Sequence, residues 1–326
     1  MQPTRFAAVM LSGLLLVATT GCGVLGSSSA GESHGQLEKT QIKVANLSLV
    51  DSAPLFLAMD KGYFAAEGLD VQLSTGAKGS ANVDNVIGGS IDFGMTSYPP
   101  AITPQIKGAA ELKVVADAVQ TTENLILVVV PKDSKLKSPT DLAGQKIAVS
   151  SKRGISELTL DSQLKIKSVD YTKIQYVSME IAAMPGALER GDVAAAVIAE
   201  PYLTQATKTG LIKLMDPFSG STANFPWSGW VATKKFTDAN PNTVKAFQRA
   251  LNKGVADASD RDKVNKTLMQ HIKIDESTVQ LMTLPVFPST VDAVRLQRVA
   301  DLMLEMGEID KKIDMHTMVL DQQAQK

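Results

Sequence analysis

Short apolar runs alternate with stretches of helical periodicity from residue 42 onward, and glycine or proline separates most of them. Short apolar runs indicate strands, whereas apolar residues at every third or fourth position indicate helices. The pattern predicts strands at residues 42–47, 71–73, 91–95, 112–119, 125–130, 146–150, 174–177, 193–198, 211–215 and 230–233. The predicted helices lie at residues 54–68, 80–87, 99–107, 155–165, 182–190, 201–207, 241–256, 261–271 and 291–306. This alternation is typical of an α/β fold with parallel sheets.

A faint internal repeat points to two lobes. Four residues recur at a constant offset of 102: Gly89, Pro99, Gly108 and Leu112 return as Gly191, Pro201, Gly210 and Leu214. Each copy orders a helix, a glycine stop, a strand and a helix begun by proline. The chain after residue 240 is helical only and would return to cover the first lobe. We therefore expect lobe 1 at residues 40–122 and 235–326 and lobe 2 at residues 123–234.

The first 22 residues have the pattern of a bacterial export signal. Arg5 gives a short basic start, and the mostly apolar segment 6–17 is too short to cross a bilayer of about 30 Å. Small residues then lead to Cys22, the only cysteine of the chain, in a context that resembles a lipobox. We expect a signal peptide at 1–21, a lipid on Cys22 and a flexible linker at 22–39. An ordinary signal with an incidental cysteine is the alternative.

A lipidated Cys22 would hold the protein at the extracytoplasmic face of the cell membrane, in the periplasm if the cell is Gram-negative. Gly23 directly after the cysteine favours a Gram-positive source.

The composition excludes several classes of function. With 33 basic and 34 acidic residues the net charge is −1, which gives no signal for nucleic-acid binding. A hydrophobic content of 44% is too high for a disordered chain. One cysteine and three scattered histidines do not make the ligand set of a zinc or iron–sulfur site. We therefore expect no metal and no cofactor.

The loops that follow the predicted strands carry the candidate binding residues, because ligands of open α/β sheets bind beyond the carboxyl ends of the strands. Four such loops stand out, at residues 48–54, 96–100, 150–157 and 199–202. The proposed ligand-binding residues are Asp51, Ser52, Ser97, Tyr98, Ser151, Arg153, Glu200, Tyr202 and, in a later aromatic loop, Trp227. Capping or solvation is the alternative role for Asp51 and Ser52. Trp230 lies on a predicted strand and is assigned to the core.

Each candidate offers a distinct chemistry beside a plain structural alternative. Tyr98 has a ring and a hydroxyl that suit ligand orientation. Ser151 and Arg153 lie at a predicted helix start, where free N–H groups attract an anion, although a basic surface loop has the same sequence. Glu200 would pair with a ligand amine or with Arg153, or would only begin a surface helix. Together these residues suit a small polar or charged solute.

Five segments occur in a recognisable order along two-thirds of the chain: IKVANLSLVDSAPLFLAMDKGYFAAEGLDVQL, GGSIDFGMTSYPPAI, PKDSKLKSPTDLAGQKIAVSS, GALERGDVAAAVIAEPYLTQA and KKFTDANPNTVKAFQRAL. In this order they resemble the substrate-binding proteins of ABC importers, within the group that includes sulfonate, taurine, nitrate and thiamine-precursor binders. The resemblance implies a two-lobed periplasmic-binding-protein-like (type II) fold. Two strands cross between the lobes of that fold, and the ligand lies in the cleft.

The resemblance implies a non-catalytic receptor that captures a small polar organic or anionic solute, sulfonate-, taurine- or nitrate-like or pyrimidine-like. Such a receptor closes by a hinge motion and delivers its solute to ABC permease subunits. We expect a monomer. Two alternatives remain: a protein like the family's pyrimidine-precursor-forming enzyme, and a ligand-dependent sensor subunit of a membrane kinase. The enzyme needs nucleophiles or bases in the cleft, but the one cysteine is Cys22 and no histidine lies in a cleft loop.

Overall fold

The computed structural model describes residues 35–320. The expected signal peptide, Cys22 and most of the expected linker lie outside the described residues. In the described part of the chain, no helix is both long enough and apolar enough to span a bilayer.

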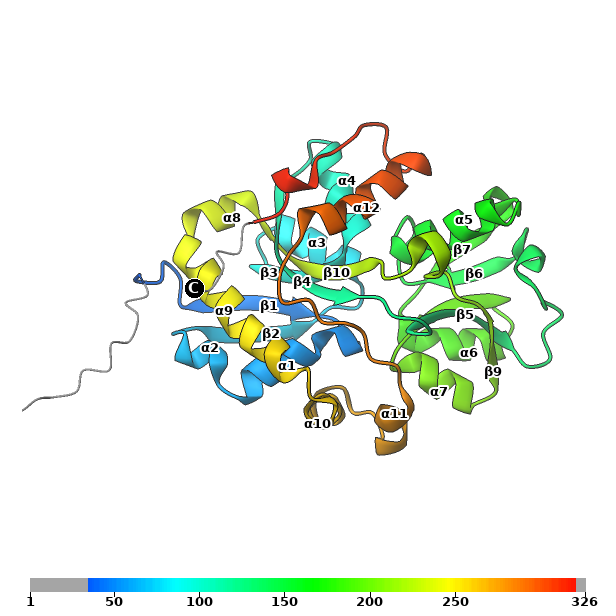
Figure 1. The fold of residues 1–326 in the computed structure, drawn as a ribbon, viewed down its shortest axis with the longest axis horizontal. Coiled ribbons are helices and arrows are strands. Elements are labelled where there is room, and N and C mark those ends of the chain that lie inside the picture. Colours follow the sequence, from blue (N-terminus) through cyan, green and yellow to red (C-terminus); the bar gives the residue numbers. More distant parts are fainter. Residues whose placement is uncertain (1–34, 321–326) are drawn as a thin grey trace, which may run out of the picture. The chain divides into compact units, whose positions relative to one another are not determined.

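Two five-stranded sheets form the framework of the described chain (Figure 1). The first sheet has the order β2-β1-β3-β10-β4, and its strands are β1 (Gln41–Asn46), β2 (Asp70–Thr75), β3 (Phe93–Ser97), β4 (Leu112–Gln120) and β10 (Pro226–Thr233). The second has the order β7-β6-β8-β5-β9, and its strands are β5 (Ile126–Pro131), β6 (Lys146–Val149), β7 (Gln175–Ser178), β8 (Ala195–Ala199) and β9 (Leu211–Met215). The fold is therefore α/β, as the alternating pattern predicted.

Both sheets are mixed, whereas the alternation predicted parallel sheets. In the first sheet β1 pairs in parallel with β2 and β3, but β10 runs antiparallel to β3 and β4. In the second, β6 pairs in parallel with β7 and β8, but β5 runs antiparallel to β8 and β9. The chain reaches β5 directly from β4 of the first sheet, and it reaches β10 directly from β9 of the second sheet. These two strands, which enter from the other sheet, are the ones that run antiparallel to their neighbours.

Strand β10 begins four residues earlier than the predicted strand at 230–233. Proline, serine and glycine in PWSGW are typical of a loop, but pairing with β3 and β4 makes the segment a strand with bulges. Trp227 therefore lies on a strand and not in a loop. The strand also lies in the first sheet, although the expected division put residues 123–234 in the second lobe.

Helices cover both sheets (Figure 1). Those after first-sheet strands and in the later chain are α1 (Ala53–Asp60), α2 (Tyr63–Ala66), α3 (Gly79–Ile87), α4 (Tyr98–Ile106), α8 (Lys234–Ala239), α9 (Pro241–Asp257), α10 (Arg261–Ile272), α11 (Glu276–Leu281) and α12 (Ala293–Glu305). Those between second-sheet strands are α5 (Ile155–Ile166), α6 (Met184–Glu189) and α7 (Tyr202–Lys208). In the chain after residue 240, here called the helical tail, α9 packs on α1. Helix α12 packs on α4 and β10 and also contacts α5.

Aromatic side chains hold the first sheet to its helices. The rings of Phe93 on β3 and Phe247 on α9 stack with centroids 4.1 Å apart, and Trp230 meets Phe247 edge-on at 5.9 Å. Trp230 is 1% exposed, which confirms its assignment to the core. Burial of such large rings contributes a major share of the packing free energy.

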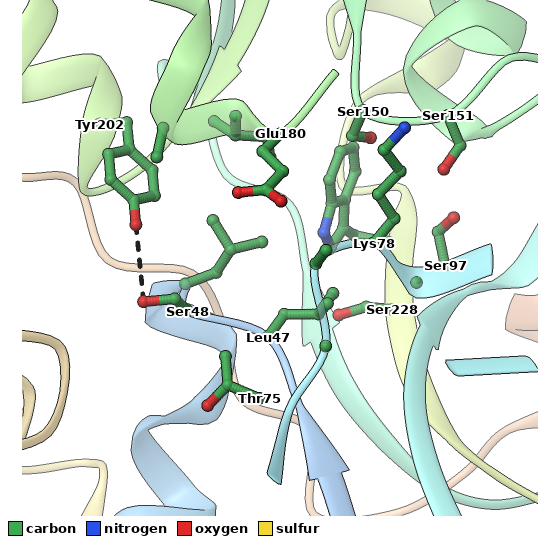
Figure 2. A pocket seen from close by; sticks show the side chains of 17 residues that line it. Leu47, Ser48, Thr75, Lys78, Ser97, Ser150, Ser151, Glu180, Tyr202 and Ser228 are labelled. Atoms are coloured by element: carbon green, nitrogen blue, oxygen red, sulfur yellow. Dashed lines mark hydrogen bonds between the residues drawn. The ribbon is translucent and has the colours of Figure 1, made fainter. Parts of the chain in front are cut away.

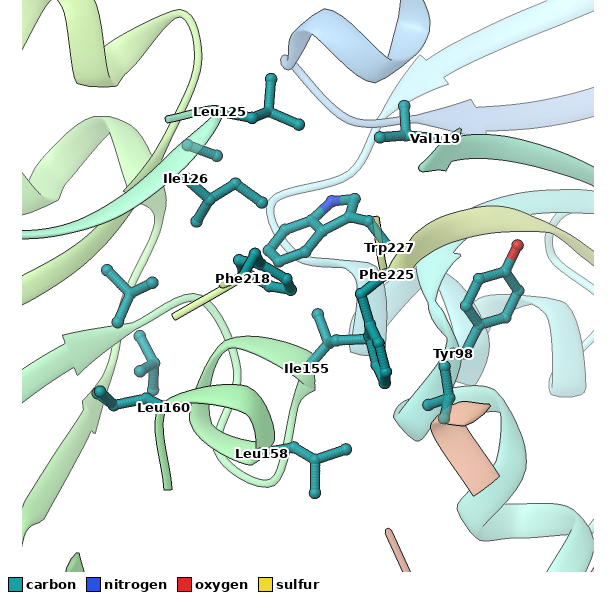
Figure 3. Close-up of a cluster of buried hydrophobic side chains, with 14 of the residues drawn as sticks. Tyr98, Val119, Leu125, Ile126, Ile155, Leu158, Leu160, Phe218, Phe225 and Trp227 are labelled. Atoms are coloured by element: carbon teal, nitrogen blue, oxygen red, sulfur yellow. The ribbon is translucent and has the colours of Figure 1, made fainter. Parts of the chain in front are cut away.

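A second buried cluster lies where the chain passes between the sheets (Figure 3). Trp227 meets the ring of Phe218 edge-on at 5.4 Å, with Leu125 and Ile126 beside them. This cluster fixes the position of Trp227, which also lines the cavity described next.

Candidate functional site

A cavity of about 280 Å³ is lined by loops from both sheets (Figure 2). From the first sheet come residues after β1, β2 and the end of β3, together with Trp227 and Ser228 of β10. From the second come residues after β6, β7 and β8. All six loops follow the carboxyl ends of strands that pair in parallel, which is where ligands of open α/β sheets bind.

The cavity wall combines one cation, one carboxylate and many hydroxyls. The Lys78 ammonium donates a hydrogen bond to Ser178 Oγ at 3.0 Å. Among the described residues the Glu180 carboxylate has no hydrogen-bond or ion-pair partner, and Glu180 is exposed. Hydroxyls line the wall at Ser48, Thr75, Ser97, Ser150, Ser151, Tyr202 and Ser228, and apolar surface comes from Leu47, Leu49, Ile181 and Trp227. The lining therefore suits a solute with charged ends and a short apolar body.

Two helices begin at the cavity wall. Lys78 precedes α3 and Ser97 precedes α4, and neither side chain caps its helix. The first N–H groups of α3 therefore have no side-chain cap, whereas Pro99 and Pro100 in the first turn of α4 have no N–H. The positive ends of both helix dipoles lie at the wall. Gly79 allows this approach, because a Cβ there would lie 2.9 Å from Thr96 Oγ1. This arrangement favours an anionic group beside Lys78.

Hydrogen bonds join the loops of the two sheets around the cavity. They connect Tyr202 Oη to Ser48 Oγ at 3.5 Å, Lys78 Nζ to Ser178 Oγ at 3.0 Å, and the Ser80 and Ser151 hydroxyls at 3.3 Å. Figure 2 shows Tyr202 reaching across to Ser48. Residues of both sheets thus contribute to one site.

Of the nine residues predicted from the sequence, four line this cavity: Ser97, Ser151, Tyr202 and Trp227. The other five do not line it: Asp51, Ser52, Tyr98, Arg153 and Glu200. Their contacts give the reason in each case.

Asp51 and Ser52 lie in a buried turn, η1 (Val50–Ser52), just behind the wall. Ser52 donates to the Leu47 carbonyl at 2.6 Å and makes no helix-capping bond, so it holds the turn. Asp51 accepts a hydrogen bond from Ser228 Oγ at 2.6 Å. Burial raises the pKa of Asp51 to about 6, although hydrogen bonds from Ser228 and Trp227 lower it.

Tyr98 is fully buried in the first sheet's helix layer. Its hydroxyl donates to Asp117 Oδ1 at 2.5 Å and contacts the Ser228 carbonyl at 3.0 Å. Asp117 is in turn paired with Arg295 of α12. The hydroxyl that the sequence analysis assigned to the ligand is therefore already used inside the protein.

Glu200 is also buried and fully engaged. Its carboxylate accepts bonds from the Thr204 N–H at 3.0 Å and hydroxyl at 2.8 Å, and from the Thr283 N–H at 3.2 Å. Burial raises the pKa of Glu200, and these hydrogen bonds oppose that shift. The Glu200 side chain therefore accepts hydrogen bonds at the start of α7 and joins this helix to the later chain at Thr283. These contacts are structural.

Arg153 points to the tail and not into the cavity. Its guanidinium pairs with the Glu308 carboxylate at 2.7 Å and donates to the Glu308 carbonyl at 2.8 Å. The chain turns at Arg153 with φ of 55°, which separates its direction from that of Ser151 two residues earlier.

Two charged residues of the wall, Lys78 and Glu180, were not predicted from the sequence. They lie in the loops after β2 and β7, and neither loop was among the four chosen. The rule that selected loops after strands also applies to these two, so the signal was present in the sequence.

This fold is that of the periplasmic binding proteins. The NMT1/THI5-like family model matches residues 50–264, and the chain belongs to that family. The alkanesulfonate-binding protein SsuA from Xanthomonas axonopodis pv. citri, solved with MOPS, has a TM-score of 0.74 at 21% identity, and the match covers 87% of this chain and 99% of that one.

Two curated relatives are binding proteins of Escherichia coli. The aliphatic sulfonates-binding protein is 27% identical over 240 residues, which cover 69% of this chain and 72% of the relative. The taurine-binding periplasmic protein is 23% identical over 216 residues, 66% of this chain and 65% of the relative. These likenesses support a substrate-binding role and an extracytoplasmic location, and they do not favour the enzyme alternative.

Proposed function

We propose that this protein is the extracytoplasmic solute-binding component of an ABC importer and that its solute is a small aminoalkanesulfonate or a similar zwitterion. The observation that carries the proposal is one cavity that holds both the Lys78 ammonium and an unpaired Glu180 carboxylate. The taurine-binding and sulfonate-binding relatives agree with this chemistry.

The anionic end of the solute would lie against Lys78 and the starts of α3 and α4. A sulfonate has three acceptor oxygens, and the first N–H groups of α3 and the Lys78 ammonium supply donors without a compensating negative charge, while α4 contributes the positive end of its dipole. Ser97 and Ser151 add hydroxyl donors at the same wall.

The ammonium end would pair with Glu180. An unpaired carboxylate beside a simple anion would repel it, whereas beside an ammonium it gains a partner. The short carbon chain between the ends would pack on Trp227 and Ile181.

Capture would proceed by closure of the two lobes, which we propose at residues 40–122 with 235–326 and at 123–234, apart from β10. The three hydrogen bonds across the cavity would form on closure, and the bound solute would favour the closed state by touching both lobes. The closed form would then be recognised by permease subunits.

Titration calorimetry with taurine and ethanesulfonate tests the proposal, because the two probes differ by the amine alone. In Glu180→Gln we expect the taurine affinity to fall at least about tenfold, or 1.4 kcal/mol, and the ethanesulfonate affinity to stay or rise. Lys78→Met should weaken both probes. Glu189→Gln, an exposed carboxylate outside the cavity, is the matched control and should change neither. Failure of both probes to bind the wild type would overturn the proposed solute class.

We also propose that residues 1–21 are removed and that Cys22 carries a lipid, with residues 22–39 as the tether. Labelled fatty acid should enter the wild-type protein and not Cys22→Ser. Equal labelling of both proteins would contradict a lipid anchor on Cys22. A wild-type protein that takes up no label and is released completely from the membrane would favour an ordinary signal peptide.

A further inference from the structure

A buried carboxylate lies directly behind the cavity wall. Asp51 is 4% exposed and does not line the cavity, but Ser228, which does, donates its hydroxyl hydrogen to Asp51 Oδ2 at 2.6 Å. The indole of Trp227, the other β10 residue of the wall, lowers the pKa of Asp51 and so lies close to this carboxylate. Within residues 35–320 no cation pairs with this carboxylate.

Ser228 is held from two sides. Its hydroxyl is bound to Asp51, its carbonyl lies 3.0 Å from the Tyr98 hydroxyl, and its backbone pairs with β3 at Ser97. The Ser228 side chain therefore cannot turn away without removing the hydroxyl donor of Asp51 Oδ2. While Asp51 is ionised, the Ser228 hydroxyl has given away its only hydrogen and offers the cavity lone pairs alone.

We propose that Asp51 is a specificity-determining residue that acts through Ser228 and Trp227 without touching the solute. When Asp51 is ionised, Ser228 presents only hydrogen-bond acceptors to the cavity, and the negative charge of Asp51 lies behind it. Both features favour solute groups that donate hydrogen bonds. The protonated carboxyl releases the Ser228 hydrogen to the cavity and removes the charge, which favours anions. This inference rests on the proposed function for its solute, and it adds a control of solute charge.

The transition falls in an accessible pH range, because burial raises the pKa of Asp51 to about 6. Other ionisable groups on the elements around Asp51 are already paired with one another. Tyr98 of α4 donates to Asp117 of β4, and Asp117 pairs with Arg295 of α12. Asp60, at the far end of α1, is bound by His271. A simple anion should therefore bind tightly below pH 6 and more weakly above it.

The first experiment needs no solute. Protein labelled with ¹⁵N-tryptophan gives one indole signal for each tryptophan, and Trp227→Phe identifies the signal of Trp227. We expect the Trp227 indole shift to titrate with a midpoint near pH 6 in the wild type and to lose that midpoint in Asp51→Asn. Asp161→Asn, a buried carboxyl outside the cavity, should keep it. A flat Trp227 signal in the wild type, or a midpoint that survives Asp51→Asn, would overturn the inference.

The second experiment measures ethanesulfonate affinity at pH 5 and pH 7.5. In the wild type we expect about a tenfold loss at the higher pH, the change that one pKa unit of coupling represents. Asp51→Asn should show less than a twofold change, and the loss should persist in Glu180→Gln, which removes the one carboxylate that lines the cavity within the described chain. Equal affinity at both pH values in the wild type refutes the inference. If the indole titrates but neither ethanesulfonate nor taurine binds at any pH, the proposed solute class fails while the coupling of Asp51 to the wall stands.

Discussion

Tyr98→Phe separates a structural role from a ligand-binding role at a single atom. The substitution keeps the ring, so it opens no cavity, and it removes the hydroxyl that contacts Asp117 and the Ser228 carbonyl. Asp117 keeps its pair with Arg295 and the Ala118 N–H at 3.1 Å, but one buried carboxylate oxygen loses its tyrosine donor.

The expected cost follows from these contacts. A hydrogen bond to a charged group contributes about 1.5–3 kcal/mol and a neutral one about 1 kcal/mol. We therefore expect Tyr98→Phe to lower the free energy of unfolding by about 2–4 kcal/mol, with about 2–4 °C of lost Tm for each kcal/mol. Because the ring does not line the cavity, solute affinity should change by less than about threefold.

Urea unfolding followed by circular dichroism measures the stability, and calorimetry measures the affinity. Tyr171→Phe is the matched control, since the Tyr171 hydroxyl makes no hydrogen bond in the described structure, and its stability should shift by less than about 0.5 kcal/mol. A Tyr98→Phe protein with wild-type stability and tenfold weaker binding would refute the structural role and restore Tyr98 as a ligand contact.

Three further substitutions test other parts of the fold. Gly254→Ala puts a Cβ 2.0 Å from the Pro54 carbonyl, so it should destabilise the α1–α9 contact by at least about 2 kcal/mol despite the better helix propensity of alanine; an unchanged urea midpoint would contradict this. Burial raises the pKa of Asp161 from 3.8 to about 7, so this carboxyl costs stability increasingly as the pH rises between those values. Asp161→Asn loses the bond from Tyr176, yet it should stabilise the protein by about 1–3 kcal/mol at pH 8 and by less than about 0.5 kcal/mol at pH 4; equal effects in urea at both pH values would exclude the shift. Arg298→Met removes donors to three backbone carbonyls just before β10, at 2.9, 2.9 and 3.2 Å, and should speed amide exchange in that segment; unchanged exchange would show that the contacts do not restrain it.

The sequence was sufficient to predict which loops form the candidate site. The carboxyl ends of strands could be located because apolar runs end at polar or glycine residues within the same short segment. Ser97, Ser151 and Tyr202 were found in this way, and Lys78 and Glu180 lie in loops that the same rule covers. A local pattern is sufficient for this step because strand ends are a local property.

The direction of each side chain within a loop was not predictable. Ser97 and Tyr98 are neighbours, yet one lines the cavity and the other is buried on Asp117, which lies 19 residues further along the chain. Whether a polar group is free for a ligand depends on partners that are distant in sequence. The Thr283 N–H that holds Glu200 is 83 residues away from it.

Local periodicity and the order of motifs were enough to predict the α/β class, nearly all the strands and helices, and the family resemblance. Three features became visible only in the folded protein: β10 joins the first sheet, Lys78 and Glu180 share one cavity, and Asp51 lies behind the wall. The physical reason is that burial and hydrogen-bond pairing are set by segments that meet through folding. Asp51 and Ser228 are 177 residues apart in the chain and 2.6 Å apart in the protein.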